Sequence, residues 1–380
     1  MKWSFKIARI AGIDVMIHWT FATLLFWLAT ANLIQGRGIV ASALGLAFVL
    51  SIFGCVVLHE FGHALVARRF GIKTPDITLL PIGGVARLER IPEDPKQEFL
   101  IAIAGPLVNV VIALALGAAL WLTSSLDLTT VSDGDWSGSG FWRSLLLVNV
   151  FLVLFNLIPA FPMDGGRVLR AILATNMDHV KATEIAANVG QAIAIGFGVI
   201  GLFSNWFLLF IALFIYIGAQ SEAQMVLTRS LLEGVRVRDA MMTRFVAVGP
   251  HDPLSSVVEE ILAGDQEDFP VVDDGHVLGI LRKKEVIAAI AHGKPESEVA
   301  AAMQTDCLPV SEDDMLRDTL ESMQQSACST LPVFRDGRLV GLLTQANVAE
   351  WLMIQSAMHT ADQRTQGPFG NSAPSMPLQR

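Results

Sequence analysis

Long apolar stretches dominate the N-terminal part of the chain. Six of them approach the length of about 20 residues that a helix needs to cross a bilayer. They cover residues 15–34, 40–66, 98–123, 142–160, 186–203 and 205–225. The pattern predicts a polytopic α-helical membrane protein with about six transmembrane helices.

A different pattern begins near residue 235, where short β-like runs alternate with amphipathic helices. FPVVDDGHVLGIL, residues 269–281, matches LPVFRDGRLVGLL, residues 331–343, and the same offset aligns Met241 with Met303. In each copy an apolar strand, an Asp-Gly turn, a second strand and a helix follow one another, which indicates a repeated α/β unit. The predicted domains are a membrane domain, two repeats and a disordered tail without apolar periodicity, at residues 1–228, 235–292, 297–357 and 360–380.

Composition narrows the possible partners. Hydrophobic residues make up 52% of the 380 residues and charged residues 17%, too apolar for an ordinary soluble domain. The net charge of −9 is concentrated in residues 235–355, which carry 10 Lys and Arg against 20 Asp and Glu. This acidic excess argues against nucleic acid and against docking on anionic lipid, because both select basic surfaces.

Cysteines and loop charges bear on the cellular compartment. Cys55, Cys307 and Cys328 are far apart without a CxxC motif, so we expect neither a disulfide framework nor a thiolate metal site. A reducing cytoplasm suits the soluble part. Basic residues gather before the first span and after the second and fourth, whereas an acidic loop, residues 126–140, lies on the other side. The positive-inside rule then places both termini in the cytoplasm, with the chain in the cell membrane.

A cleavable signal peptide is an alternative for the first apolar stretch. The cationic start and the ATA sequence at residues 29–31 favour it. The length and late start of the apolar stretch argue against it.

Ionisable residues interrupt the second apolar stretch in the sequence HEFGH. His59 and His63 are four residues apart, so on a helix they can present their nitrogens to one ion, with Glu60 beside it. Zinc suits this arrangement, since it takes nitrogen and oxygen ligands and can activate a water. A metal also accounts for polar side chains that would otherwise be costly in lipid. A chance HExxH with both histidines hydrogen-bonded in the bundle is the alternative.

A third ligand is expected in NLIPAFPMDGGRVL, residues 156–169. Pro159 and Pro162 break the fourth span, and the following Gly165 and Gly166 are expected to let the chain turn. A broken helix at membrane depth lines a cavity or is covered by protein. Asp164 can therefore reach the metal, unless it only caps the next helix. Asn156 can stabilise an oxyanion or contact a substrate carbonyl, or simply link two helices.

HEFGH, AGPLVN (104–109) and NLIPAFPMDGG, in this order, resemble the site-2 protease family (M50) of intramembrane zinc metalloproteases. The repeats resemble a tandem pair of cystathionine-β-synthase (CBS) domains. The resemblance implies one Zn²⁺ per chain on His59, His63 and Asp164, with Glu60 as general base and Asn156 as a substrate contact. It implies regulated intramembrane proteolysis of a single-pass membrane protein in membrane lipid, such as an anti-sigma factor.

Two further segments could serve such a reaction. The β-like runs of residues 76–89 could form a hairpin whose edge receives an unwound substrate strand, or an ordinary surface loop. His18 could polarise a group near the site, but a hydrogen-bonded interfacial residue beside Trp19 is favoured.

Two other functions compete with the protease. A transporter or channel regulated by CBS domains would carry intramembrane charges along a pathway in several spans, whereas this chain concentrates them in one place. An inactive scaffold of the protease fold would be expected to lose Glu60 or a ligand, and all four residues are present.

The CBS pair is expected to bind an adenine nucleotide in at most one cleft. The second copy offers Thr344 and Asn347, where adenosyl-binding CBS domains commonly carry Thr or Ser and an Asp; the amide lacks the strength of a charged acceptor. The first copy has Arg282 and Glu285 in these places. We expect the pair to act in gating or in homodimer formation.

Cysteine labelling in intact cells tests the predicted topology. A cysteine introduced at Asp133 should react with a membrane-impermeant reagent, and one introduced at Lys96 should be protected until lysis. The reverse pattern would overturn the orientation.

Overall fold

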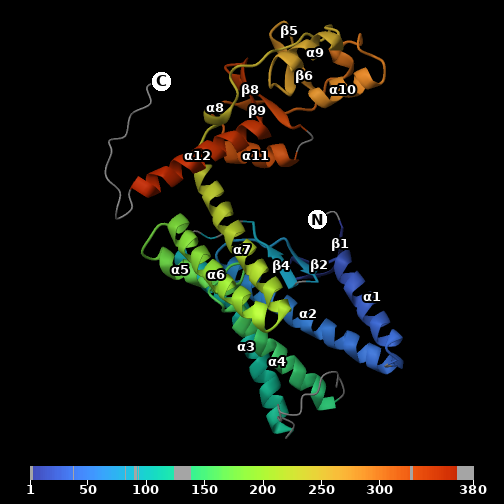
Figure 1. The fold of residues 1–380 in the computed structure, drawn as a ribbon, viewed down its shortest axis with the longest axis vertical. Helices are drawn as coiled ribbons and strands as arrows, with labels where there is room; N and C mark the ends of the chain where they lie inside the picture. Colours follow the sequence, from blue (N-terminus) through green and yellow to red (C-terminus); the bar gives the residue numbers. More distant parts are fainter. Residues whose placement is uncertain are drawn as a thin grey trace. The chain divides into compact units, whose positions relative to one another are not determined.

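The computed structural model describes residues 3–36, 38–81, 83–89, 92, 94–123, 138–325 and 328–365 (Figure 1). The chain divides into two compact units, Met1–Val226 and Leu227–Arg380. Most of the predicted acidic loop, including Asp133, lies outside the described residues.

Five helices of the described residues are long and apolar enough to span a membrane. They correspond to the last five predicted spans. Their bounds are Gly38–Arg69 (α2), Pro95–Leu122 (α3), Gly138–Asn156 (α4), His179–Phe203 (α6) and Trp206–Leu231 (α7). Helices α3 and α4 pack side by side, and α2 packs against α3 (Figure 1). Close packing of α2 and α3 depends on Gly62, where a Cβ would lie 2.7 Å from the carbonyl oxygen of Ala104.

The first predicted span is wrong in its first four residues, which belong to a strand. Helix α1 covers only Trp19–Ile34. Before it, β1 (Ser4–Ile10) and β2 (Ile13–His18) form an antiparallel hairpin. The cause is a period-two pattern within the apolar run: Ile13 and Val15 face inward and pack on α2, and a strand rather than a helix satisfies this alternation. His18 caps α1 and bonds Thr20 at 2.8 Å, as favoured from the sequence.

The predicted hairpin over residues 76–89 is confirmed. Strand β3 (Asp76–Leu80) pairs antiparallel with β4 (Gly83–Arg87). Strand β2 joins β3 in parallel, which gives one sheet of order β1-β2-β3-β4 with β4 at an edge.

The predicted break in the helix of the fourth span is confirmed, but the predicted role of the two glycines that follow it was wrong. Helix α4 ends at Asn156, and α5 covers Asp164–Ala174. Gly165 and Gly166 lie inside α5 instead of in a turn. A Cβ on Gly165 would lie 2.2 Å from the carbonyl oxygen of Ile158, so the glycines let α5 pack on the segment that precedes it.

The second unit contains the two predicted repeats. The first has α9 (Leu254–Ala263), β5 (Asp268–Asp273), β6 (His276–Arg282) and α10 (Lys283–Ala291). The second has β7 (Val310–Ser311), α11 (Leu316–Gln325), β8 (Thr330–Arg335), β9 (Arg338–Thr344) and α12 (Gln345–Thr365). Each repeat has its own apolar core.

The repeats exchange short segments. Met242 pairs with Leu342 of the second repeat, and Gln304 pairs with Ile280 of the first. The offset that aligns the two copies in the sequence also relates these two pairs, so the repeats clasp each other symmetrically. The predicted tail is wrong in its first six residues, 360–365, because no helix breaker occurs before Gly367 and α12 continues to Thr365. Residues 366–380 lie outside the described part of the chain.

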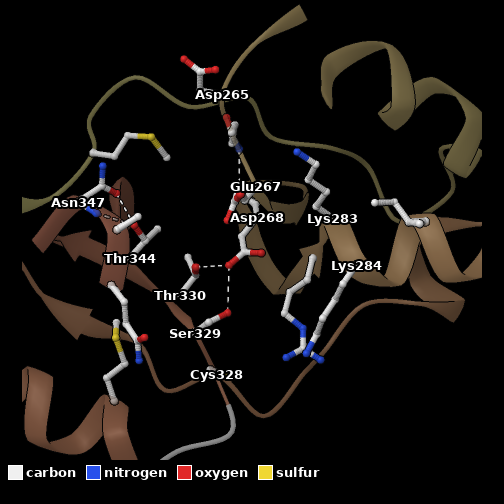
Figure 2. A pocket seen from close by; sticks show the side chains of 17 residues that line it. Asp265, Glu267, Asp268, Lys283, Lys284, Cys328, Ser329, Thr330, Thr344 and Asn347 are labelled. Carbon is white, nitrogen blue, oxygen red and sulfur yellow. Dashed lines mark hydrogen bonds between the residues drawn. The ribbon is translucent and has the colours of Figure 1, made fainter. Parts of the chain in front are cut away.

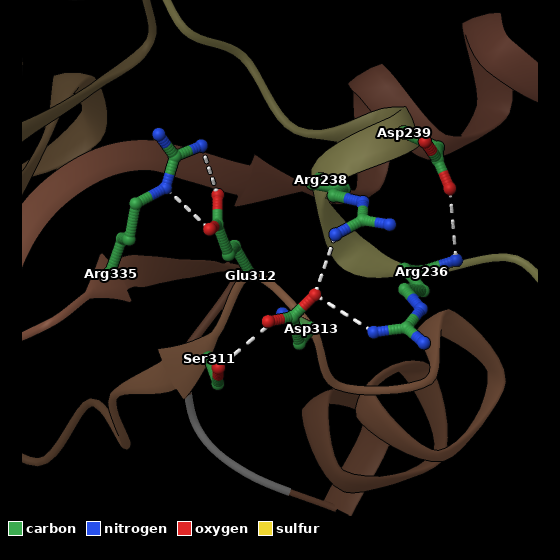
Figure 3. A network of polar contacts seen from close by, with 7 residues as sticks. All are labelled: Arg236, Arg238, Asp239, Ser311, Glu312, Asp313 and Arg335. Atoms are coloured by element: carbon green, nitrogen blue, oxygen red, sulfur yellow. Dashed lines mark hydrogen bonds and ion pairs between the residues drawn. The ribbon is translucent and has the colours of Figure 1, made fainter.

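The two repeats together are called the module. Exposed ion pairs join the start of the module to the second repeat (Figure 3). Arg236 and Arg238 both donate to Asp313, at 2.8 and 2.7 Å. The neighbouring Glu312 accepts a bidentate hydrogen bond from Arg335, which holds the pKa of Glu312 below its usual range. This pair therefore stabilises the fold above the ordinary carboxyl pKa, and the contribution is lost as the pH falls through the lowered value.

The expectation that the chain has no disulfide framework was wrong for two of its three cysteines. Cys307 and Cys328 form a disulfide with 5.5 Å between their Cα atoms. Their separation of 21 residues and the absence of a CxxC motif hid this pairing, because folding brings the segment before β7 next to the start of β8.

Candidate metal centre

Three possible metal ligands from two helices converge inside the first unit, Met1–Val226, which we call the membrane unit. His59 and His63 lie on α2, and Asp164 is the first residue of α5. Oδ2 of Asp164 is 3.1 Å from Nε2 of His59 and 3.2 Å from Nε2 of His63, and the two Nε2 atoms are 3.1 Å apart. All three side chains are buried. The structure thus brings together the three residues that were predicted from the sequence as metal ligands.

Hydrogen bonds from α3 determine which nitrogen of each imidazole faces the cluster. Nδ1 of His63 donates to the carbonyl oxygen of Ile101 at 2.7 Å, and Nδ1 of His59 donates to Oδ1 of Asn109 at 2.6 Å. Each Nε2 therefore carries a lone pair. Two lone pairs and a carboxylate repel one another at these distances unless a cation lies among them. The donor set fits zinc, which accepts imidazole and carboxylate ligands.

A chain of buried amides supports His59. Nδ2 of Asn109 donates to Oδ1 of Asn149 on α4 at 2.9 Å, so the oxygen of Asn109 is left to face the imidazole. Nδ2 of Asn149 in turn donates to the carbonyl oxygen of Leu145 at 2.8 Å. Both amides are completely buried. In the sequence, Asn109 was notable only as part of AGPLVN and Asn149 was not notable, because nothing in the pattern indicates that these two side chains, 40 residues apart, meet.

Gly105 leaves space for an ion beside the ligands. A Cβ on this residue of α3 would lie 2.2 Å from Nε2 of His63 and 2.7 Å from Nε2 of His59. Helix α3 therefore approaches the ligand atoms with bare backbone, and a side chain at this position would occupy the space of the metal.

Glu60 lies beside the edge strand of the sheet. It is half-buried on α2, and a Cβ on Gly84 of β4 would lie 2.9 Å from its Cγ. The bare backbone of β4 thus passes next to the predicted general base. Asn156 is the last residue of α4. Among the hydrogen bonds of the described residues, none joins it to the three ligands, and its role stays a prediction.

An ionic cluster that the sequence did not reveal anchors the helix of Asp164. Arg170 on α5 is 1% exposed and donates through Nε to Glu98 on α3 and through Nη1 to Glu222 on α7, both at 2.7 Å. Its guanidinium lies 5.0 Å from the ring centre of Phe161. Removing one partner of such a buried pair is strongly destabilising, so Arg170 fixes the position of α5 and, with it, Asp164.

The module contains a second candidate site, a cleft of about 920 Å³ between the repeats (Figure 2). Asp268 of the first repeat accepts hydrogen bonds from Ser329, at 3.1 Å, and from Thr330. Thr344 and Asn347 line this cleft as expected, and the Thr344 hydroxyl donates to Oδ1 of Asn347 at 2.6 Å.

The first repeat contributes charged groups to the cleft. Lys283 and Lys284 line it from the start of α10 (Figure 2). The neighbouring Arg282 donates through Nη2 to Glu285 at 2.7 Å.

Comparisons with known proteins assign a family to both parts of the chain. The model of peptidase family M50 matches residues 47–136 and 127–197, and that of the CBS domain matches 237–292 and 297–354. A zinc metalloprotease of Methanocaldococcus jannaschii is 34% identical over 93% of this chain and 97% of its own length. The chain belongs to the M50 family of site-2 proteases.

A second relative and a solved structure also match. Rip3 of Mycobacterium tuberculosis, also named as a zinc metalloprotease, is 30% identical over 92% of this chain and 93% of its own length. The solved site-2 protease from Methanocaldococcus jannaschii is 39% identical, covers 58% of this chain and 95% of the solved chain, and has a TM-score of 0.43. By its family and its apolar helices, the protein is a multi-pass zinc metalloprotease with a CBS pair, and the transporter and inactive-scaffold readings are not supported.

Substitution of Asn109 should weaken metal binding without touching a ligand. Asn109→Leu removes the acceptor of His59 Nδ1, and we expect zinc affinity to fall by about 10- to 100-fold. Asn109→Asp keeps an acceptor there and should retain most of the affinity. Chelator competition on the purified proteins measures this, with Asp164→Ala as the reference for ligand loss. Equal affinities for Asn109→Leu and wild type would remove Asn109 from the site.

Proposed function

We propose that the protein hydrolyses a peptide bond within or near the transmembrane segment of a single-pass membrane protein, as a step of regulated intramembrane proteolysis. The convergence of His59, His63 and Asp164 next to Glu60, inside a bundle of apolar helices, carries this proposal. The substrate is a membrane-anchored regulator, such as an anti-sigma factor.

Different residues of the chain bind the metal, transfer the proton and position the reacting groups. His59, His63 and Asp164 would hold one zinc ion, which would supply the Lewis-acid chemistry for activating water and polarising the scissile carbonyl. Glu60 takes the proton of the attacking water and passes it to the leaving nitrogen. Asn109 and Asn149 hold His59 in the required tautomer. Asn156, at the end of α4, contacts the substrate carbonyl or the developing oxyanion.

The edge of β4 receives the substrate. A transmembrane helix hides its carbonyls in its own hydrogen bonds, so a segment must unwind before it is cut. An unwound segment can pair with the free edge of β4 by β-augmentation. Support comes from Gly84, whose backbone approaches Glu60 so closely that no side chain fits between them. A strand added at this edge would pass the general base.

Both termini and the CBS pair face the cytoplasm of the cell, which requires the shorter apolar helix α1 to cross the membrane together with the five long helices. The basic residues that follow the second and fourth spans support this orientation. The active site then opens toward the cytoplasm.

The membrane proteome of cells with Glu60→Gln tests the proposed activity. This variant keeps the three ligands and should retain zinc, but it lacks the base, so an uncut membrane fragment of the substrate should accumulate. Wild-type cells provide the comparison, and metal content of the purified variant is the control. A variant that holds zinc and accumulates no fragment would contradict the proposed reaction.

We further propose that the cleft of the CBS pair binds one adenine nucleotide near Thr344 and Asn347, and that the pair regulates the protease by gating or homodimer formation. The hydroxyl and amide that line the cleft support a ribose contact, and Lys283 and Lys284 are available for phosphates. The acidic excess of the module weakens attraction for a polyphosphate.

Calorimetry with AMP, ATP and S-adenosylmethionine measures this binding. We expect no more than one weak site per chain, and Thr344→Ala should weaken it because a hydrogen-bonding group is lost. Two tight sites would show that the first repeat also binds.

A further inference from the structure

In each repeat, two segments meet at the start of the first strand of the β-hairpin, and we call this place the junction. The two repeats hold the junction together by different chemistry. In the second repeat, the disulfide joins Cys307, before β7, to Cys328, before β8. The equivalent positions of the first repeat, at the offset that aligns Met241 with Met303, are Phe245 and Gln266. There, the side chain of Gln266 accepts from the backbone N–H of Val246 at 2.8 Å and donates to its carbonyl at 2.9 Å. One junction is thus held by hydrogen bonds and the other by a sulfur–sulfur bond.

The first repeat thus closes this junction without a covalent link. Gln266 holds the first repeat with bonds that no redox change affects. Cys307 and Cys328 pack in the apolar core of the second repeat, where reduced thiols are tolerated as small apolar groups. The junction can therefore exist in an oxidised and a reduced state on the same fold.

The junction is part of the wall of the cleft. Cys328 and Gln266 both line it. Two residues after Cys328, Thr330 bonds Asp268 of the first repeat. On the other side, three residues before Cys307, Gln304 pairs with Ile280 of the first repeat. The disulfide therefore ties together two segments that each hold the repeats to one another.

We propose that Cys307 and Cys328 form a reversible thiol–disulfide site that controls the rigidity of the cleft wall. A disulfide in a domain that lies in a reducing cytoplasm is more often a redox sensor than a structural link; this step rests on the proposed topology. Its chemical partner is a low-molecular-weight thiol–disulfide couple.

The exchange balances in two steps. Cys307 is half-buried and Cys328 is 3% exposed, so the thiolate of Cys307 attacks first. It forms a mixed disulfide with one half of the small disulfide, and the other half leaves as a thiol. The Cys328 thiolate then attacks Cys307 sulfur and releases the second small thiol. Two electrons pass from the cysteine pair to the small disulfide, and the two cysteine protons end on the two released thiols.

Redox titration of the purified full-length protein tests the site. The protein is equilibrated in glutathione buffers of varied ratio, quenched with acid and alkylated under denaturing conditions, and the alkylated cysteines are located by mass spectrometry. We expect Cys55 to be alkylated throughout, and Cys307 and Cys328 to become alkylated together as the ratio shifts. Alkylation of all three cysteines at every ratio, or a disulfide that survives excess thiol, would overturn the proposal.

Hydrogen exchange of the oxidised and reduced protein tests the effect on the wall. Reduction should increase exchange severalfold in residues 328–335 and leave the equivalent residues 266–273 unchanged. The double variant Cys307→Phe, Cys328→Gln imports the residues of the first repeat and should lose all redox dependence while it stays folded. Identical exchange in oxidised and reduced wild type would refute control of the wall even if the disulfide is reversible.

Discussion

Two imidazoles and a carboxylate buried among apolar helices are the constraint that organises the membrane unit. Lipid offers no hydrogen bonds, so each polar atom of these side chains needs a partner from the protein or an ion. Helix α3 meets most of this demand. It provides the carbonyl of Ile101, the amide of Asn109 and the bare backbone of Gly105. A single helix thus orients both histidines and leaves room for what they bind.

The third ligand depends on a different kind of support. Asp164 begins a short helix after an irregular segment, so local structure alone would not hold it in place. Arg170 supplies the missing restraint, because its guanidinium joins α5 to both α3 and α7. Since α7 continues past Val226 into the second unit, the same arginine contacts the helix through which the two parts of the chain are connected.

Local patterns in the sequence were sufficient to predict the metal ligands and the two repeats. His59 and His63 share a face by helical spacing alone, and the repeated strands align by a fixed offset. Contacts between distant helices left no such signal, which is why Asn149 and Arg170 escaped notice. Hydropathy also could not separate β2 from α1, because both are apolar and only the alternation at Ile13 and Val15 distinguishes a strand. The disulfide was missed for the same reason as the amides, since proximity in space was not visible as proximity in the chain.

The bare backbone at Gly105 has a consequence for how relatives of this enzyme are sorted into active and inactive members. HExxH and the distant aspartate by themselves do not report whether the space between the ligands is open. Because a single β-carbon at position 105 would collide with both histidine nitrogens, replacement of this glycine alone could silence the enzyme while every ligand and the general base remain. Pseudoproteases that look intact by their motifs should therefore be sought among sequences that have lost this one glycine.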